Sequence, residues 1–373
     1  MIKISIIMAI SLLLAYQSEM RTRTLQNCGS HYHYRDDPAF ILLVIFLCLI
    51  AGLRIHFNDT QNYLGIYTRF PGITEFLSSP QNLNPLKNPL FYAYMGILKT
   101  LGFSGQFFLF STAVFCETAL LLFFKRYSKH FTFSIFLFFT LGTFNVTISA
   151  IKQVIAMAVV SLAFPFLEKR KWGSYFFFVF LAMLFHTYAL TYAVLPFFIQ
   201  RPWKLFTYLF AIIVFFLMQN FESYISEFLD QASLLGKEIA EYEVFDNNSV
   251  NILRLGVYAV PPALSLVFRR WIFHESSQMD HILVHMSIIS LAFMILGTNS
   301  GANMFGRMGN YFELGTIVML PEMLDRTFNR RSYRLISGIA VVCFLGFFIY
   351  ANGIHGRFDA EYAMVDLVQL LLK

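Results

Sequence analysis

Three basic residues stand at the ends of long apolar runs, where a cation could meet a phosphorylated ligand. Arg54 closes one such run, Lys152 opens another, and Arg307 follows a third. Cationic side chains at a membrane boundary can neutralise a pyrophosphate through charge-assisted hydrogen bonds, because the dielectric there is low. The alternatives are a helix-end arginine that snorkels, an interfacial lysine anchor and an ordinary loop charge. We expect the three to form one pyrophosphate-binding site.

Two further side chains could remove a proton from an attacking hydroxyl, namely Asp59 and His186. Asp59 shares a helical face with Tyr63, four residues on. His186 lies in an apolar run, where burial favours the neutral imidazole that a base requires. We therefore expect His186 to be the base and Asp59 to bind the acceptor. The alternatives are a helix-capping Asp59 and a structural His186 satisfied by Thr187 or a carbonyl.

The composition requires that these residues be positioned by membrane helices. The chain has 373 residues, of which 57% are hydrophobic and 13% charged, about half the charge of a soluble domain. Its 45 Phe residues are too much apolar surface for a water-soluble globule of this size. A soluble enzyme, a disordered chain and a nucleic-acid binder are excluded. The fold class that we expect is an all-α, polytopic membrane helical bundle.

Apolar runs long enough to cross a bilayer recur along the whole chain. The clear ones are residues 39–53, 103–124, 131–151, 153–167, 205–221, 255–268, 282–305 and 335–356. Residues 173–200 are too long for one span and short for two, so with Pro196 inside they predict a helix followed by a short or broken partner. With two shorter runs near 4–16 and 314–321, we expect about twelve crossings in a single transmembrane domain, residues 1–373. A GT-C-like arrangement is one form that such a bundle could take.

Basic clusters between the apolar runs set the predicted orientation. Seventeen of the 28 Lys and Arg residues fall in clusters that alternate with loops nearly free of them, and such clusters mark the cytoplasm. The clusters are Arg21, Arg23, Arg35; Lys125, Arg126, Lys129; Lys169, Arg170, Lys171; Arg201, Lys204; Arg269, Arg270; and Arg326, Arg330, Arg331, Arg334. Residues 56–88 and the acidic segment 222–251 then form outer loops, provided that 89–102 is a re-entrant helix.

Several kinds of site have no signature in the sequence. A Gly-rich phosphate loop, a GxGxxG dinucleotide motif and an HExxH metal motif do not occur. The four cysteines are scattered, so we expect neither a metal nor a cofactor. Arg254 and Glu313 are predicted to pair structurally within the bundle.

Four short motifs, taken in order, resemble those of the EpsG-like branch of the Wzy-type polysaccharide polymerases. The first is Gly52, Arg54, Asp59, Thr60, Tyr63; the second Lys152, Gln153, Ala156; the third Ala182, His186, Thr187; and the fourth Arg307, Tyr311, Phe312. The resemblance covers residues 40 to 350. Lys152 is a departure, because an arginine is more usual there and lysine cannot make a bidentate phosphate contact.

The resemblance implies a multi-pass protein of the bacterial inner membrane. Its activity would be that of a glycosyltransferase that polymerises oligosaccharide units carried on undecaprenyl pyrophosphate, giving O-antigen or exopolysaccharide at the periplasmic face. Arg54, Lys152 and Arg307 would hold the pyrophosphate, and Asp59 and His186 would be catalytic. Thr60, Tyr63, Gln153 and Tyr311 would support them. Membrane lipid and a chain-length regulator would be further partners, and nucleic acid would not.

Three other functions are compatible with the same residues. A flippase or transporter of lipid-linked glycan needs a charged cavity open to both faces, whereas the informative charges here gather at one face. A glycan ligase would use the same donor. A membrane O-acyltransferase needs a deep histidine, for which His186 is the candidate.

Overall fold

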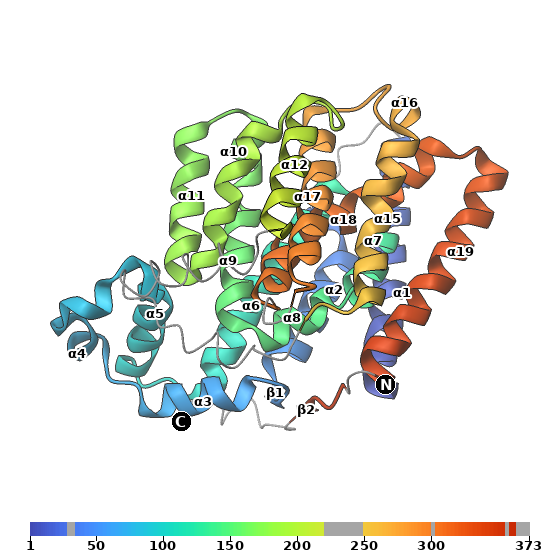
Figure 1. Cartoon of the computed structure of the whole chain (residues 1–373). Helices are drawn as coiled ribbons and strands as arrows, with labels where there is room; N and C mark the ends of the chain where they lie inside the picture. Colours follow the sequence, from blue (N-terminus) through green and yellow to red (C-terminus); the bar gives the residue numbers. More distant parts are fainter. Residues whose placement is uncertain (28–33, 220–248, 300–302, 355–357, 363–373) are drawn as a thin grey trace. The chain divides into compact units, whose positions relative to one another are not determined.

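A computed structural model describes residues 1–27, 34–219, 249–299, 303–354 and 358–362 (Figure 1). The predicted acidic loop 222–251 therefore lies almost wholly outside the described residues. The chain divides into two compact units. Unit 1 comprises Met1–Phe164, Phe177–Ala189 and Phe348–Lys373, and unit 2 comprises Pro165–Phe176 and Leu190–Phe347.

Unit 1 is built around α6 (Gly105–Tyr127), which packs against α2 (Pro38–Gly52) and α9 (Ile151–Ser161). The helix starts follow from capping residues. Asp37 accepts a hydrogen bond from the backbone N–H of Phe40 at the start of α2, and Ser104 does the same for Phe107 at the start of α6. The other elements are α1 (Ile2–Asn27), η1 (Tyr34–Asp36), α3 (Thr60–Arg69), α4 (Ile73–Ser78), η2 (Pro80–Leu83), η3 (Pro85–Lys87), α5 (Pro89–Thr100), α7 (Phe131–Thr140), α8 (Thr143–Ser149) and a π-helical turn, η5 (Tyr350–Ile354).

One small sheet interrupts the helices of unit 1. Strand β1 (Arg54–His56) pairs antiparallel with β2 (Glu361–Tyr362), and Arg54 lies opposite Tyr362. The expectation of an all-α bundle is confirmed for the described residues apart from these two short strands. The sheet ties the segment after α2, which carries two predicted site residues, to the end of the described chain.

The apolar run 131–151 is not one straight helix. It breaks into α7 and α8, which are bent by 61° to each other. The break lies at Gly142, whose φ of 89° is in the left-handed region that glycine adopts without a steric penalty. A second break at Ala150 separates α8 from α9. Lys152 therefore stands in the first turn of a new helix.

Unit 2 is centred on the pair α17 (Gln278–Leu296) and α18 (Asn303–Thr327), with α15 (Ile252–Val267) and α12 (Leu205–Gln219) packed on α17. The two central helices approach closely at Gly315, where any Cβ would overlap the carbonyl oxygen of Leu283. A capping box of Ser277 and Asp280 begins α17. The remaining elements are α10 (Phe164–Glu168), α16 (Arg269–Ile272) and α19 (Arg330–Ile349).

The segment 173–200 has the predicted form of a helix followed by a short, irregular partner. It contains α11 (Trp172–Phe185) and the 3₁₀ helix η4 (Thr187–Phe198), which includes Pro196. Their residues are divided between the two units.

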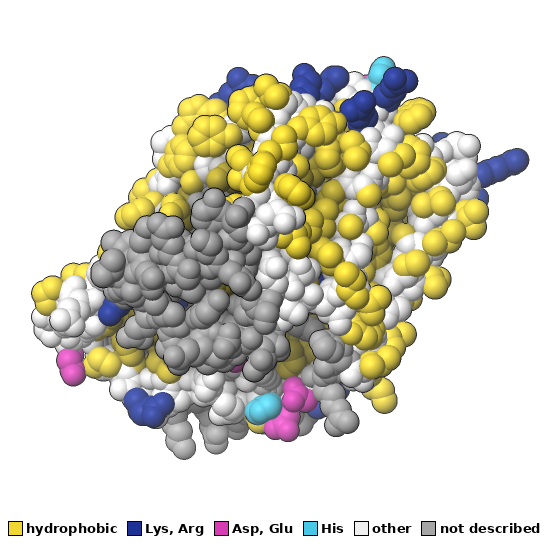
Figure 2. All heavy atoms as spheres, viewed as in Figure 1, with side chains coloured by type: hydrophobic (Ala, Val, Ile, Leu, Met, Phe, Trp, Pro, Cys, Tyr) yellow, Lys and Arg dark blue, Asp and Glu magenta, His cyan; other side chains and the backbone are white. Residues whose placement is uncertain are grey.

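Large apolar side chains lie exposed on several helices, as Figure 2 shows for one face of the molecule. On α19, Leu335, Ile339 and Val342 are exposed at helical spacing, and α12 exposes Phe215 and Phe216. Apolar faces of this kind are suited to lipid. The chain is a multi-pass membrane protein.

The count of about twelve crossings is not confirmed. Among the described residues, 5 helices are long and apolar enough to cross a membrane, or 6 if the bent pair α7–α8 counts as one span. Five further apolar helices are 10–17 residues long. Helix α5, predicted to be re-entrant, has 12 residues, so it rises about 18 Å, short of a hydrocarbon core of about 30 Å. Its re-entrant placement remains a prediction.

Candidate active site

The first turn of α5 is where residues from several predicted motifs meet in unit 1. Asn88 precedes this turn in a left-handed conformation, with a φ of 55°, and it is the N-cap of α5. Phe91 and Tyr92 follow in the turn itself. Side chains from α3 and α9, and the junction between α11 and η4, contact these three residues. We call Asn88, Phe91 and Tyr92 the α5 turn.

Lys152 contacts the α5 turn directly. Its Nζ donates a hydrogen bond to the Tyr92 hydroxyl at 2.8 Å. The same Nζ lies 4.6 Å from the centre of the Tyr92 ring and 5.2 Å from that of Phe91, which are cation–π distances. Lys152 is half-buried, and no carboxylate of the described residues lies within 4 Å of its Nζ. Its ammonium charge is thus met by neutral groups.

Gln153, the neighbour of Lys152, has a different environment. Only 3% of it is exposed, and its Nε2 lies 4.0 Å from the sulfur of Met157 on the next turn of α9. The supporting role predicted for Gln153 is therefore one within the bundle, behind Lys152.

Helix α3 brings Tyr63 to the same turn, and Asp59 stands one turn before Tyr63 at the start of this helix. Asp59 occupies the N-cap position of α3, yet its side chain makes no capping hydrogen bond. Asn58 before it has a φ of 45°, an uncommon conformation for a residue other than glycine. The Tyr63 ring packs edge-on against Phe91, with ring centres 5.9 Å apart. The half-buried Asp59 carboxylate is therefore not used to cap its own helix.

Arg54 is buried, with 2% of its surface exposed. Its Nε donates to the Thr60 hydroxyl at 3.2 Å, and its Nη1 donates to the carbonyl of Ala51. Thr60 is fully buried and donates in turn to the carbonyl of Phe57 at 2.7 Å. Arg54 and Thr60 thus brace the loop that leads to Asp59. The pyrophosphate contact predicted for Arg54 remains a prediction.

The apolar sequence around His186 predicted a position within a helix. The structure instead places His186 between two helices. Helix α11 ends at Phe185, and His186 forms the junction with η4, where it is half-buried. Its ring packs edge-on against Tyr188, with centres 4.8 Å apart. Thr187 binds the α5 turn, because its backbone N–H donates to Oδ1 of Asn88 at 3.2 Å. The junction therefore brings His186 to the same turn that Lys152 contacts.

Arg307 and Tyr311 belong to unit 2. Arg307 is half-buried near the start of α18, and Tyr311 is fully buried one turn further on. The Tyr311 carbonyl accepts a hydrogen bond from the hydroxyl of Tyr192, whose ring packs edge-on against that of Tyr311 with centres 5.9 Å apart. The Tyr192 hydroxyl therefore anchors the backbone of α18 at Tyr311, one turn after Arg307.

Comparison with known proteins gives one match. A model of the EpsG family matches residues 39–357. The chain belongs to the EpsG family. No curated protein and no solved structure matches it. Membership of the EpsG family makes the chain a polysaccharide polymerase in general terms, a glycosyltransferase-like enzyme that acts at a membrane on a lipid-linked sugar.

Some polar residues of this EpsG-family chain that make the contacts described above were not predicted from the sequence. Tyr92 and Asn88 were not singled out, although the α5 turn depends on both. In unit 2, Arg254 donates to Oδ1 of Asn310 at 2.6 Å and lies 5.5 Å from the centre of the Tyr258 ring. The Tyr258 hydroxyl donates to Glu313 at 2.6 Å. The predicted pair of Arg254 and Glu313 thus shares Tyr258 as a common neighbour.

Proposed function

We propose that this EpsG-family protein joins oligosaccharide units carried on undecaprenyl pyrophosphate into O-antigen or exopolysaccharide. The reaction takes place at the periplasmic face of the bacterial inner membrane. The observation that carries the proposal is the position of Lys152, which is half-buried and whose ammonium contacts the Tyr92 hydroxyl and the rings of Phe91 and Tyr92. A cation in this setting favours an anionic ligand, because no carboxylate of the described part of the chain neutralises its charge.

The donor pyrophosphate binds against the α5 turn in this proposal. The N-terminal end of a helix carries partial positive charge, which favours phosphate. Lys152 adds a full charge beside that end. Arg307 belongs to unit 2, and its contact with the pyrophosphate remains a prediction from the sequence. Arg54 acts by bracing the loop before Asp59, since its guanidinium already binds Thr60 and Ala51.

The chemical step is a displacement at the anomeric carbon of the donor. The acceptor hydroxyl oxygen forms the new bond to this carbon, and the bond from the carbon to the pyrophosphate oxygen breaks. The electron pair and negative charge leave with the lipid pyrophosphate, which Lys152 stabilises. His186 takes the hydroxyl proton as the general base, and Asp59 orients the acceptor sugar. The protein needs no nucleotide for this step, because the donor is already activated.

Glycan length in a deletion strain tests the proposal against its alternatives. Loss of the polymer ladder with one unit retained on the surface is the expected result, and the wild-type gene restores the ladder. Retention of the ladder without attachment would indicate a ligase, and loss of all surface glycan would indicate a flippase; either contradicts the proposal. A chain-length regulator, if it binds this protein, changes the mean length of the ladder without abolishing it.

A further inference from the structure

Unit 2 contains a pocket of about 580 Å³ at the end where α16 lies. Four cationic side chains line it: Arg201 and Lys204 before α12, and Arg269 and Arg270 in α16. Pro202, Trp203, Phe273 and His274 complete the walls. Figure 2 shows Lys and Arg side chains gathered at this end. The volume suits a small anionic group, since ligand pockets are typically about 300–1,000 Å³.

The wall formed by residues 201–204 is held in place by side-chain hydrogen bonds. Trp203 has a φ of 61°, an uncommon left-handed conformation. Its indole Nε1 donates to the hydroxyl of Ser265 on α15 at 2.9 Å, and its backbone N–H donates to Thr207 at 3.1 Å. This turn therefore has a defined shape that a ligand can match.

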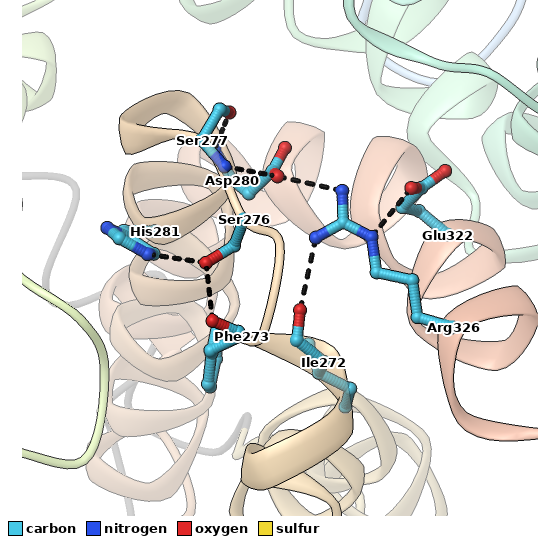
Figure 3. A network of polar contacts seen from close by, with 8 residues as sticks. All are labelled: Ile272, Phe273, Ser276, Ser277, Asp280, His281, Glu322 and Arg326. Carbon is cyan, nitrogen blue, oxygen red and sulfur yellow. Dashed lines mark hydrogen bonds and ion pairs between the residues drawn. The ribbon is translucent and has the colours of Figure 1, made fainter.

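The opposite wall is fixed by the network in Figure 3. Arg326 at the end of α18 donates to the carbonyl of Ile272 at 3.1 Å, and it pairs with Asp280 at 2.8 Å and with Glu322 at 2.7 Å. Ser276 donates to the carbonyl of Phe273 at 3.2 Å. These bonds fix the turn between α16 and α17, which carries Phe273 into the pocket.

The four pocket cations differ from Arg326 in lacking acidic partners. No carboxylate of the described residues lies within 4 Å of Arg201, Lys204, Arg269 or Arg270. Four like charges around one cavity repel each other unless an anion is bound between them. Arginine in particular binds phosphate through paired hydrogen bonds. A group with more than one phosphate matches this set of side chains best.

Exposed apolar side chains border the pocket. Leu205 at the start of α12 is 68% exposed, Val267 at the end of α15 is 66% exposed, and Trp271 in α16 is 59% exposed. A soluble phosphate compound would leave these side chains uncovered, whereas the acyl chains of a lipid would cover them. The positive-inside rule further predicts that these basic clusters face the cytoplasm, at the membrane surface.

We propose that this pocket binds the phosphate head group of an anionic membrane lipid, with preference for a lipid that carries two phosphates. Basic pockets between membrane helices at the cytoplasmic side are suited to such head groups. The acyl chains lie along the exposed apolar residues of α12 and α15. The site is separate in its residues from the α5 turn and does not depend on the proposed polymerase mechanism.

Trp203 provides a local signal for the test. The chain has three tryptophans, so the Trp172→Phe, Trp271→Phe protein retains Trp203 alone. This protein, in uncharged detergent micelles, is titrated with diphosphatidylglycerol, phosphatidylglycerol, phosphatidylcholine and inorganic pyrophosphate. We expect a saturable change in Trp203 emission with diphosphatidylglycerol, weaker binding of phosphatidylglycerol, and no change with phosphatidylcholine.

Paired substitutions separate the pocket from general charge attraction. Arg269→Gln with Arg270→Gln should weaken binding at least about tenfold, because two charged hydrogen-bond donors are lost. Arg201→Gln with Lys204→Gln tests the other wall and should act in the same direction. The matched control is Arg330→Gln with Arg331→Gln, an exposed basic pair outside the pocket, which should change the affinity less than about twofold.

Three results would overturn the proposal. The first is equal weakening by the control pair, which would mean attraction to total charge. The second is inorganic pyrophosphate binding as tightly as diphosphatidylglycerol, which would mean a soluble phosphate compound. The third is no Trp203 response to any lipid while both wall variants and the wild type remain monodisperse and equally helical.

Discussion

The Nζ of Lys152 lies 2.8 Å from the hydroxyl of Tyr92 and faces the rings of Phe91 and Tyr92. This contact joins the first turn of α9 to the first turn of α5. Two further residues contact the same α5 turn. Thr187, the neighbour of His186, donates a hydrogen bond to Asn88, and the ring of Tyr63 packs against Phe91. Three other segments, α3, the start of α9 and the junction of α11 with η4, therefore converge on this one short helix.

Substitution of Lys152 tests its charge separately from its packing. Lys152→Ala should lower polymerisation about 30-fold to 1,000-fold, because one charge-assisted contact in a transition state is worth about 2–4 kcal/mol. Lys152→Arg should retain activity, since it keeps the charge. Tyr92→Phe keeps both rings and loses only the hydroxyl, so we expect a smaller loss, about fivefold. Initial rates with a lipid-linked unit measure all three. Equal rates for Lys152→Ala and the wild type would remove Lys152 from the donor site.

Asp59→Asn separates a capping role from a chemical one. Asparagine is as good an N-cap as aspartate, and Asp59 makes no side-chain capping bond. The free energy of unfolding of Asp59→Asn should therefore stay within about 0.5 kcal/mol of the wild-type value. Its affinity for the acceptor should fall. Calorimetry and acceptor titration give the two quantities. An Asp59→Asn variant that unfolds at a clearly lower temperature than the wild type but binds the acceptor with normal affinity would show that Asp59 is structural.

Arg54 and Thr60 should behave as one structural unit. Arg54→Ala leaves the Ala51 carbonyl and the Thr60 hydroxyl without their donor, which costs about 1–3 kcal/mol for each buried group left unsatisfied. Thr60→Val breaks the same bond from its other side. Each variant loses part of the free energy of unfolding. The losses of the two single variants should sum to more than the loss of the double variant. Strictly additive losses would mean that the bond contributes nothing to stability.

The apolar runs predicted the helices well, because membrane spans are read from length and hydrophobicity alone. The start of α9 beside Lys152 and the irregular partner after α11 were both anticipated. The break at Gly142 was not, since a glycine within a membrane helix does not by itself indicate that its φ is positive. The number of crossings stays a prediction, because five apolar helices of 10–17 residues look like spans in the sequence but are shorter than a full span.

The ionisable members of the candidate site were the most predictable, and Tyr63 and Thr187 were found through the motifs that contain them. Asp59, Lys152 and His186 attract notice because ionisable residues are rare in apolar sequence. Tyr92 does not, because tyrosine is common at membrane interfaces and its partner lies 60 residues away. The burial of Arg54 also had no sequence signal, since a guanidinium that braces a loop and one that binds phosphate occupy the same kind of position.

Turnover of a defined lipid-linked oligosaccharide by the purified protein tests the central claim most directly. The wild type should extend the unit into a ladder, and His186→Ala should bind the donor with unchanged affinity but form no ladder. The matched control is His274→Ala, an exposed histidine outside the α5 turn, which should polymerise normally. A ladder formed by His186→Ala at the wild-type rate, with Asp59→Asn binding substrate but inactive, would contradict the account and make Asp59 the base.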